Sequence, residues 1–158
     1  MANQNSQLVK ADDMTQWAAT DTERPWTVNE ERRWHFYKRA TMVKDARIRW
    51  CYLWKLSKIP KLDQIDVEVE PILKNWRSAP DAVACAGTVK AAIDALVDIK
   101  IIADDSAKYV RSVRFWAPTI GETQGLRLTV REVLHDREKR TDQATQIITP
   151  TPVRGNMA

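Results

Sequence analysis

The sequence predicts an α+β protein, a small mixed β-sheet with flanking α-helices, and three observations carry that prediction. The segment 40–57 contains neither Pro nor Gly and is long enough for several helical turns. Three shorter segments are typical of strands, two of them by strict alternation of apolar and polar residues. A chain of 158 residues with 44% hydrophobic content is long enough for one core and too short for two.

The first regular element is a helix over residues 40–57, and residues before Thr41 are expected to form only a turn. An apolar stripe on this helix is predicted to pack against the core: Val43, Ile48, Cys51, Tyr52 and Trp54. Four basic residues lie mostly elsewhere on its surface: Lys44, Arg47, Lys55 and Lys58.

After Pro60, alternation predicts a strand over 63–70 that could resume at 72–76. A second helix, beginning at 86 or 88 and ending near 99, places one apolar face inward: Val89, Ala92, Ile93, Leu96 and Val97. The β-branched and aromatic residues of 108–116 predict a strand. A turn at 121–125 and a strand over 126–131 follow, and the last two strands are expected to pair as a hairpin. A short strand near residues 14–19 completes the sheet.

The polar ends set the expected domain limits: a flexible segment at 1–13, one folded domain at 14–133 and a disordered tail at 134–158. No stretch is apolar enough to span a membrane, and the N-terminus lacks the apolar centre of a signal peptide, so we expect a cytoplasmic protein without a membrane partner. Cys51 and Cys85 are isolated from each other, which favours two reduced thiols over a disulfide or a zinc site.

Charge is concentrated in one part of the chain. The net charge is only +4, but nine Lys or Arg lie between Arg32 and Lys58, against one acid, Asp45. Such a run is often just the solvated face of a surface helix. The strong imbalance favours a polyanionic partner, whose phosphates supply affinity without sequence specificity.

Three segments within residues 14–132 stand out by their order and separations: RPWTVNEERRWHFYKRA, then IDVEVEP, then DAVACAGTVKAAIDALVDIKIIADDSAKYVRSVRF. Together they resemble RusA-like Holliday-junction endodeoxyribonucleases of phage and actinobacterial type. The resemblance implies a RusA-like fold and a homodimer that binds four-way or other branched DNA. It also implies paired symmetric nicks made with carboxylate-bound Mg²⁺, for which Mn²⁺ could substitute.

The resemblance also implies site residues. Two or three carboxylates can hold a magnesium ion, which orients a water and relieves charge on the leaving oxygen, while a lysine offsets phosphate charge. Catalysis is assigned to Asp81, Asp105 and Lys90, and metal binding to Asp81, Asp104 and Asp105. Contacts with DNA are assigned to Arg32, Arg33, Lys38, Arg39, Lys44, Arg47, Lys55, Arg111 and Arg114.

The chain departs from the family pattern just before the second helix. Where better-known members have D-x-D-N, this sequence has Asp81-Ala82-Val83-Ala84, and counting back from Lys90 without a gap gives Ala84 and Ala86. Three interpretations stay open: a weaker metal site, a substitute ligand such as Glu70 or Asp94, or a relative that binds junctions without cutting them.

Each candidate also has an ordinary structural interpretation. Asp81 could cap the following helix, and Asp104-Asp105-Ser106 could form a simple turn. Lys90 and Asp94 could be a surface ion pair. Asp66, Glu68 and Glu70 fit a solvated strand face, and Trp34 could belong to the core or touch unpaired bases. A DNA-binding regulator unrelated to RusA is a further hypothesis, but the sequence has no helix-turn-helix pattern.

Overall fold

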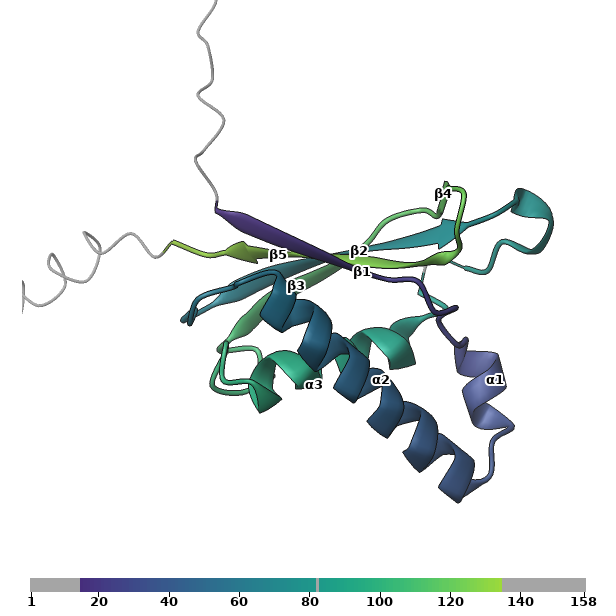
Figure 1. Cartoon of the computed structure of the whole chain (residues 1–158), viewed down its shortest axis with the longest axis horizontal. Helices are drawn as coiled ribbons and strands as arrows, with labels where there is room; N and C mark the ends of the chain where they lie inside the picture. Colours follow the sequence, from purple (N-terminus) through teal and green to yellow (C-terminus); the bar gives the residue numbers. More distant parts are fainter. Residues whose placement is uncertain (1–14, 82, 135–158) are drawn as a thin grey trace, which may run out of the picture.

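A five-stranded mixed sheet carries two helices on one of its faces, as the computed structural model shows (Figure 1). The structure describes residues 15–81 and 83–134, and the predicted α+β class with a mixed sheet and flanking helices is confirmed. The segments predicted to be flexible or disordered, 1–13 and 134–158, lie outside the described residues except for Leu134. Within the described ranges, no helix combines the length and apolar character needed to cross a membrane.

The sheet order is β1-β5-β2-β3, with the two-residue strand β4 also paired to β2. The strands are β1 Gln16–Asp21, β2 Ile65–Leu73, β3 Val110–Phe115, β4 Thr119–Ile120 and β5 Gly125–Glu132. β5 runs antiparallel to both β1 and β2, whereas β3 and β4 run parallel to β2.

The predicted hairpin between the last two strands is wrong. The alternating residues Leu126, Leu128 and Val130 are completely buried, so β5 must lie inside the sheet, between β1 and β2. β3 is a largely exposed strand that reaches its parallel position beside β2 after a crossover through a helix. Local patterns located β1, β2, β3 and β5 to within a few residues, but they missed the two-residue strand β4 and could not specify which strands pair.

Two helices replace the turn expected before Thr41, so that expectation is also wrong. α1 (Val28–Arg32) begins with a capping box, in which Thr27 accepts from the Glu30 amide while the Glu30 carboxylate accepts from the Thr27 amide. α2 (Phe36–Leu56) then starts four residues earlier than predicted. A single 3₁₀ turn, η1 (Trp76–Ser78), and the helix α3 (Ala86–Asp98) follow β2.

The buried face of α2 differs from the predicted stripe. Ala46, Trp50 and Trp54 are fully buried, whereas Ile48 and Tyr52 are 58% and 64% exposed. The indole rings of Trp50 and Trp54 lie 5.2 Å apart, and the Trp54 Nε1 donates to the Ala92 carbonyl oxygen of α3 at 3.0 Å. Trp54 belongs to the predicted stripe and is buried as expected, whereas Trp50 takes the place of Ile48 and Tyr52. The two indoles together bury a large apolar surface, so the tryptophans decide how α2 is rotated.

α3 packs as its pattern predicts. Val89, Ala92, Ile93 and Leu96 are buried against α2 and the inner face of the sheet, together with Ile65, Val67 and Val69 of β2. The alternate residues of β2, Asp66, Glu68 and Glu70, therefore lie on the outer face of the sheet, away from both helices. This agrees with the polar strand face expected from the sequence.

Gly125 allows the chain to leave β1 toward α1. A Cβ atom at this position would collide with the backbone carbonyl oxygen of Asp21 and would lie 3.3 Å from the Cα of Thr22. Both atoms belong to the backbone, so neither can move aside as a flexible side chain would.

We therefore expect Gly125→Ala to destabilise the fold by about 2 kcal/mol, in the range typical of overpacking a tight site. The midpoint of urea unfolding measures this change. Gln124→Ala, at the neighbouring position before β5, is the matched control and should leave the midpoint almost unchanged. Equal midpoints for Gly125→Ala and the wild type would show that β1 leaves the sheet by another path.

Candidate functional site

Residues 26–39 form an elbow, made of α1 and the first turn of α2, that extends beyond α3 and away from the sheet (Figure 1). Trp26, which is 3% exposed, anchors it by packing at 5.7 Å against Trp34. The backbone joins the elbow to the segment before α3, because the Val28 amide donates to the Ala84 carbonyl oxygen at 2.9 Å. The elbow is thus attached to the rest of the domain by packing and by a backbone hydrogen bond.

The structure separates the predicted DNA-binding residues by their partners. On the elbow, Arg32, Arg33 and Lys38 are exposed and form no ion pair with any described residue, and the same holds for Lys44 and Lys55 along α2. In contrast, Arg39 pairs with Glu31 at 2.8 Å, and Arg47 pairs with Asp98 at 2.6 Å. Those two arginines are already neutralised within the protein.

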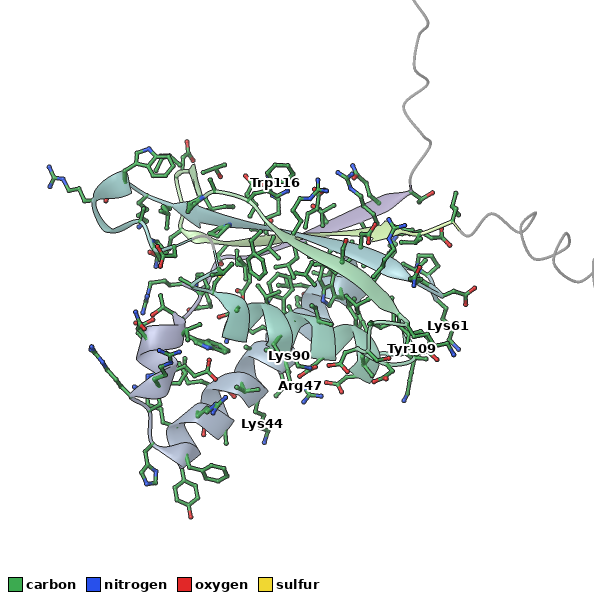
Figure 2. The ribbon with its side chains drawn as sticks, turned by 180° about the vertical axis from the view of Figure 1, so that it is seen from behind. Lys44, Arg47, Lys61, Lys90, Tyr109 and Trp116 are labelled. Carbon is green, nitrogen blue, oxygen red and sulfur yellow. The ribbon has the colours of Figure 1, made fainter. Side chains whose placement is uncertain are left out.

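Arg111 and Arg114 lie on β3, on the face of the sheet opposite the helices. Arg111 pairs with Asp66, whose pKa is held below its usual range by the guanidinium of Arg111. Arg114 stacks over Trp116, with 5.4 Å between its guanidinium carbon and the ring centroid. Figure 2 shows Trp116 beyond the sheet from Lys44 and Arg47, so the nine predicted residues do not form one continuous surface.

Further ion pairs compensate the charge of this outer sheet face. Arg131 contacts Glu68 at 3.2 Å, and Arg127 contacts Glu70 at 3.5 Å, each across the ladder between β5 and β2. On this face, acids therefore neutralise Arg111, Arg127 and Arg131, whereas Arg114 forms no ion pair with a described residue.

Two residues assigned to catalysis, Lys90 and Asp105, do come together. The Lys90 ammonium donates to the Asp105 carboxylate and also to Asp94, at 2.5 Å from its Oδ1. The hydrogen bond from Lys90 holds the pKa of Asp105 below its ordinary value, and the two carboxylates raise the pKa of Lys90. Arg47 extends the cluster, since it contacts Asp94 as well as Asp98 (Figure 2).

Asp81 lies elsewhere. Its exposed side chain lines a hollow of about 190 Å³ between the end of β2 and the start of α3, together with Arg24, Pro71 and Cys85. Asp81 does not cap α3 either, because the N-cap residue is Cys85, which is buried and has its pKa raised by that burial to about 11. Cys85 and Cys51 are both free thiols, as expected.

The three assigned metal ligands, Asp81, Asp104 and Asp105, do not gather into one cluster among the described residues. Asp81 is not brought to Asp104 and Asp105, and Asp105 is occupied by Lys90. Within residues 15–81 and 83–134, no three acidic, histidine or cysteine side chains cluster closely enough to hold a metal. Mg²⁺ commonly uses one or two carboxylates and keeps several waters, and one of the assigned ligands, the Asp105 carboxylate, accepts a hydrogen bond from the Lys90 ammonium.

Glu31 is a site residue that the sequence interpretation missed. Its carboxylate accepts from the Trp26 Nε1 at 3.2 Å and lies against Gly87, so closely that a Cβ on this glycine would collide with it. The start of α3 thus receives its acid from α1. The sequence does contain a signal for the helix that carries Glu31. The T-x-x-E pattern at 27–30 is typical of a capping box, which marks the start of a helix.

Of the two alternatives for Trp34, packing against the core agrees with its position in the elbow. Trp34 is half-buried against Trp26, with the Lys38 ammonium 5.2 Å from its ring centroid. The exposed rings are instead those of Phe36 and Tyr37, which are 73% and 74% accessible to solvent.

No protein-family model matches this chain, and no curated protein sequence matches it. Function therefore has to be inferred from the residues and their geometry.

We expect Lys90→Met to raise the pKa of Asp105 toward the ordinary carboxyl value of about 4, because the stabilising ammonium is removed. Since the pKa of Asp105 is lowered by folding, the ion pair stabilises the protein above about pH 4 and is lost as the pH falls through the lower, folded-state pKa. The contribution should stay below about 1 kcal/mol, because the side chains of Lys90 and Asp105 are 59% and 35% exposed.

An NMR titration of the Asp105 carboxyl carbon measures this shift. Lys74→Met removes an exposed lysine that forms no ion pair among the described residues and should leave the titration unchanged. If Lys90→Met has no more effect than Lys74→Met, the two side chains are not in contact in solution.

Proposed function

We propose that this protein is a RusA-like binder of four-way or other branched DNA that acts as a homodimer and contacts DNA through the elbow and the exposed face of α2. The observation that carries the proposal is the set of basic side chains on this side without an acidic partner among the described residues: Arg32, Arg33, Lys38, Lys44 and Lys55. Cations that are not neutralised within a protein are available to phosphates, and their contacts release counterions from DNA.

The mode of recognition follows from the kinds of residue. Lysines and arginines spread over an elbow and one helix face can follow a phosphate backbone, but they do not by themselves read bases. The projecting shape of the elbow suits a DNA in which arms meet at an angle. Two copies related by a two-fold axis would match the symmetry of a four-way junction.

A junction endonuclease dependent on Mg²⁺ or Mn²⁺ is the second candidate function. Its specific support is that Lys90 and Asp105, which the family resemblance assigns to catalysis, contact each other. Against it stand the alanines at 84 and 86 and the distant position of Asp81. Binding without cutting therefore agrees better with the positions of these residues within a single protomer.

Replacing Arg32, Arg33 and Lys38 together with alanine should weaken junction binding. The slope of log affinity against log salt should fall by about 1 for each phosphate that the variant no longer neutralises. Fluorescence anisotropy with a labelled four-way junction across a salt titration measures both quantities.

The matched control is Arg111→Gln, which removes an equally basic residue that is already paired with Asp66. It should change neither the affinity nor the slope. A triple variant that binds like the wild type, or a wild-type affinity that does not depend on salt, would contradict the proposed surface.

With a four-way junction, the wild type should form a complex containing two chains in EDTA and leave the DNA uncut after Mg²⁺ or Mn²⁺ is added. Sedimentation of the complex and a denaturing gel of the junction strands measure these outcomes. Paired nicks that disappear in Asp105→Asn, a change that keeps the shape and removes the charge, would establish the endonuclease instead. Nicks that persist in this variant would move the search for the metal site to Glu70 and Asp94.

A further inference from the structure

Three consecutive aromatic residues lie at the start of α2, outside the core. The rings of His35 and Tyr37 stack at 5.5 Å with 23° between their planes, and Phe36 meets Tyr37 edge-on at 5.7 Å. Phe36 and Tyr37 remain 73% and 74% exposed, more than any other large hydrophobic side chain among the described residues. Aromatic rings in water cost free energy unless they serve an interaction, so this pair at the tip of the elbow calls for a ligand.

We propose that Phe36 and Tyr37 form a stacking platform for unpaired bases of a DNA strand, held in place by the phosphate contacts of the surrounding cations. The inference deepens the proposed function and rests on it: the elbow would distinguish DNA with unstacked bases from continuous duplex. Base stacking on aromatic rings tolerates any sequence, because every base has a π face.

The charges around the platform favour nucleic acid as the occupant. Arg32, Arg33 and Lys38 lie within four residues of Phe36 and have no acidic partner among the described residues. The two nearby acids are both engaged, Glu30 by Arg24 and Glu31 by Arg39 and Trp26. A strand that places its bases on the rings would therefore find unneutralised cations beside its phosphates.

The surrounding structure holds the stacking platform in place. Trp26 and Trp34 hold the turn between α1 and α2 from beneath, the capping box fixes the start of α1, and the Thr41 hydroxyl donates to the Tyr37 carbonyl oxygen within α2 at 3.0 Å. The rings are thus presented by an ordered turn and helix, which lowers the entropic cost of binding. A paired and stacked base has no free face for such a ring, which is why the preference should be for unpaired bases.

A gapped duplex, with about six unpaired nucleotides that include 2-aminopurine, and the intact duplex of the same length provide the test. The wild type should prefer the gapped DNA by about tenfold, which corresponds to one or two stacked bases, and should change the 2-aminopurine fluorescence. Phe36→Ala combined with Tyr37→Ala should lose this preference and the fluorescence change while keeping its affinity for intact duplex. Both side chains are exposed, so the variant should retain the wild-type circular dichroism and melting temperature.

Two further variants make the result specific. Trp76→Ala removes another exposed aromatic side chain, on η1 and therefore outside the elbow and α2, and should behave like the wild type. Phe36→Trp combined with Tyr37→Trp should restore the preference for the gap, because tryptophan also stacks on bases. A double alanine variant that keeps the preference, or a tryptophan variant that does not restore it, overturns the inference.

The remaining outcomes separate this inference from the proposed function. If the wild type binds junctions and duplex but shows no preference for the gap, the platform is refuted and the branched-DNA proposal stands. If it binds none of these DNAs, both fail. Binding to vesicles containing phosphatidylserine that requires Phe36 and Tyr37, without a preference for the gap, would assign the rings to an anionic membrane surface and overturn the inference.

Discussion

The packing of Trp50 and Trp54 between the sheet and α3 is the interaction on which the rest of the structure depends. The two indoles belong to one buried cluster with residues of β1, β2, β5 and α3, and the hydrogen bond from Trp54 to the Ala92 carbonyl oxygen ties α2 to α3. Because side chains are fixed around a helix axis, burying these residues turns Ile48, Tyr52 and Lys55 outward. The rotation of α2 therefore decides which residues are available to a partner.

The start of α3 is where the elbow and the rest of the domain meet. The Val28 amide bonds to Ala84, the Thr88 hydroxyl donates to the Trp26 carbonyl oxygen at 3.5 Å, and Glu31 lies against Gly87. Small residues before and within the first turn of α3 make this contact possible. The space at the start of α3 therefore holds the elbow, and the carboxylate at this point, that of Glu31, comes from α1.

The electrostatics of the surface follow from tertiary partners more than from composition. Of the basic residues between 32 and 58, some face acids from distant parts of the chain, as Arg47 faces Asp98 and Arg49 faces Asp21. Others extend into solvent from the elbow and from α2. The outer face of the sheet carries arginines too, but Asp66, Glu68 and Glu70 compensate three of them. A surface available to phosphates is therefore smaller, and better defined, than the number of charges along the sequence indicates.

The sequence by itself determined the α+β class, the positions of the strands and the inward face of α3, because alternation and helical periodicity report local burial directly. The expectation that Lys90 and Asp105 belong to one catalytic site stays a prediction, although the two side chains form an ion pair. Only the tertiary structure decided that β5 lies between β1 and β2, that two tryptophans set the rotation of α2, and that Asp81 lies apart from Asp105. The physical reason is that strand pairing, helix rotation and ion pairing depend on segments that are far apart in the chain. The arrangement that forms is the one that buries the most apolar surface and pairs the most charges in the complete fold.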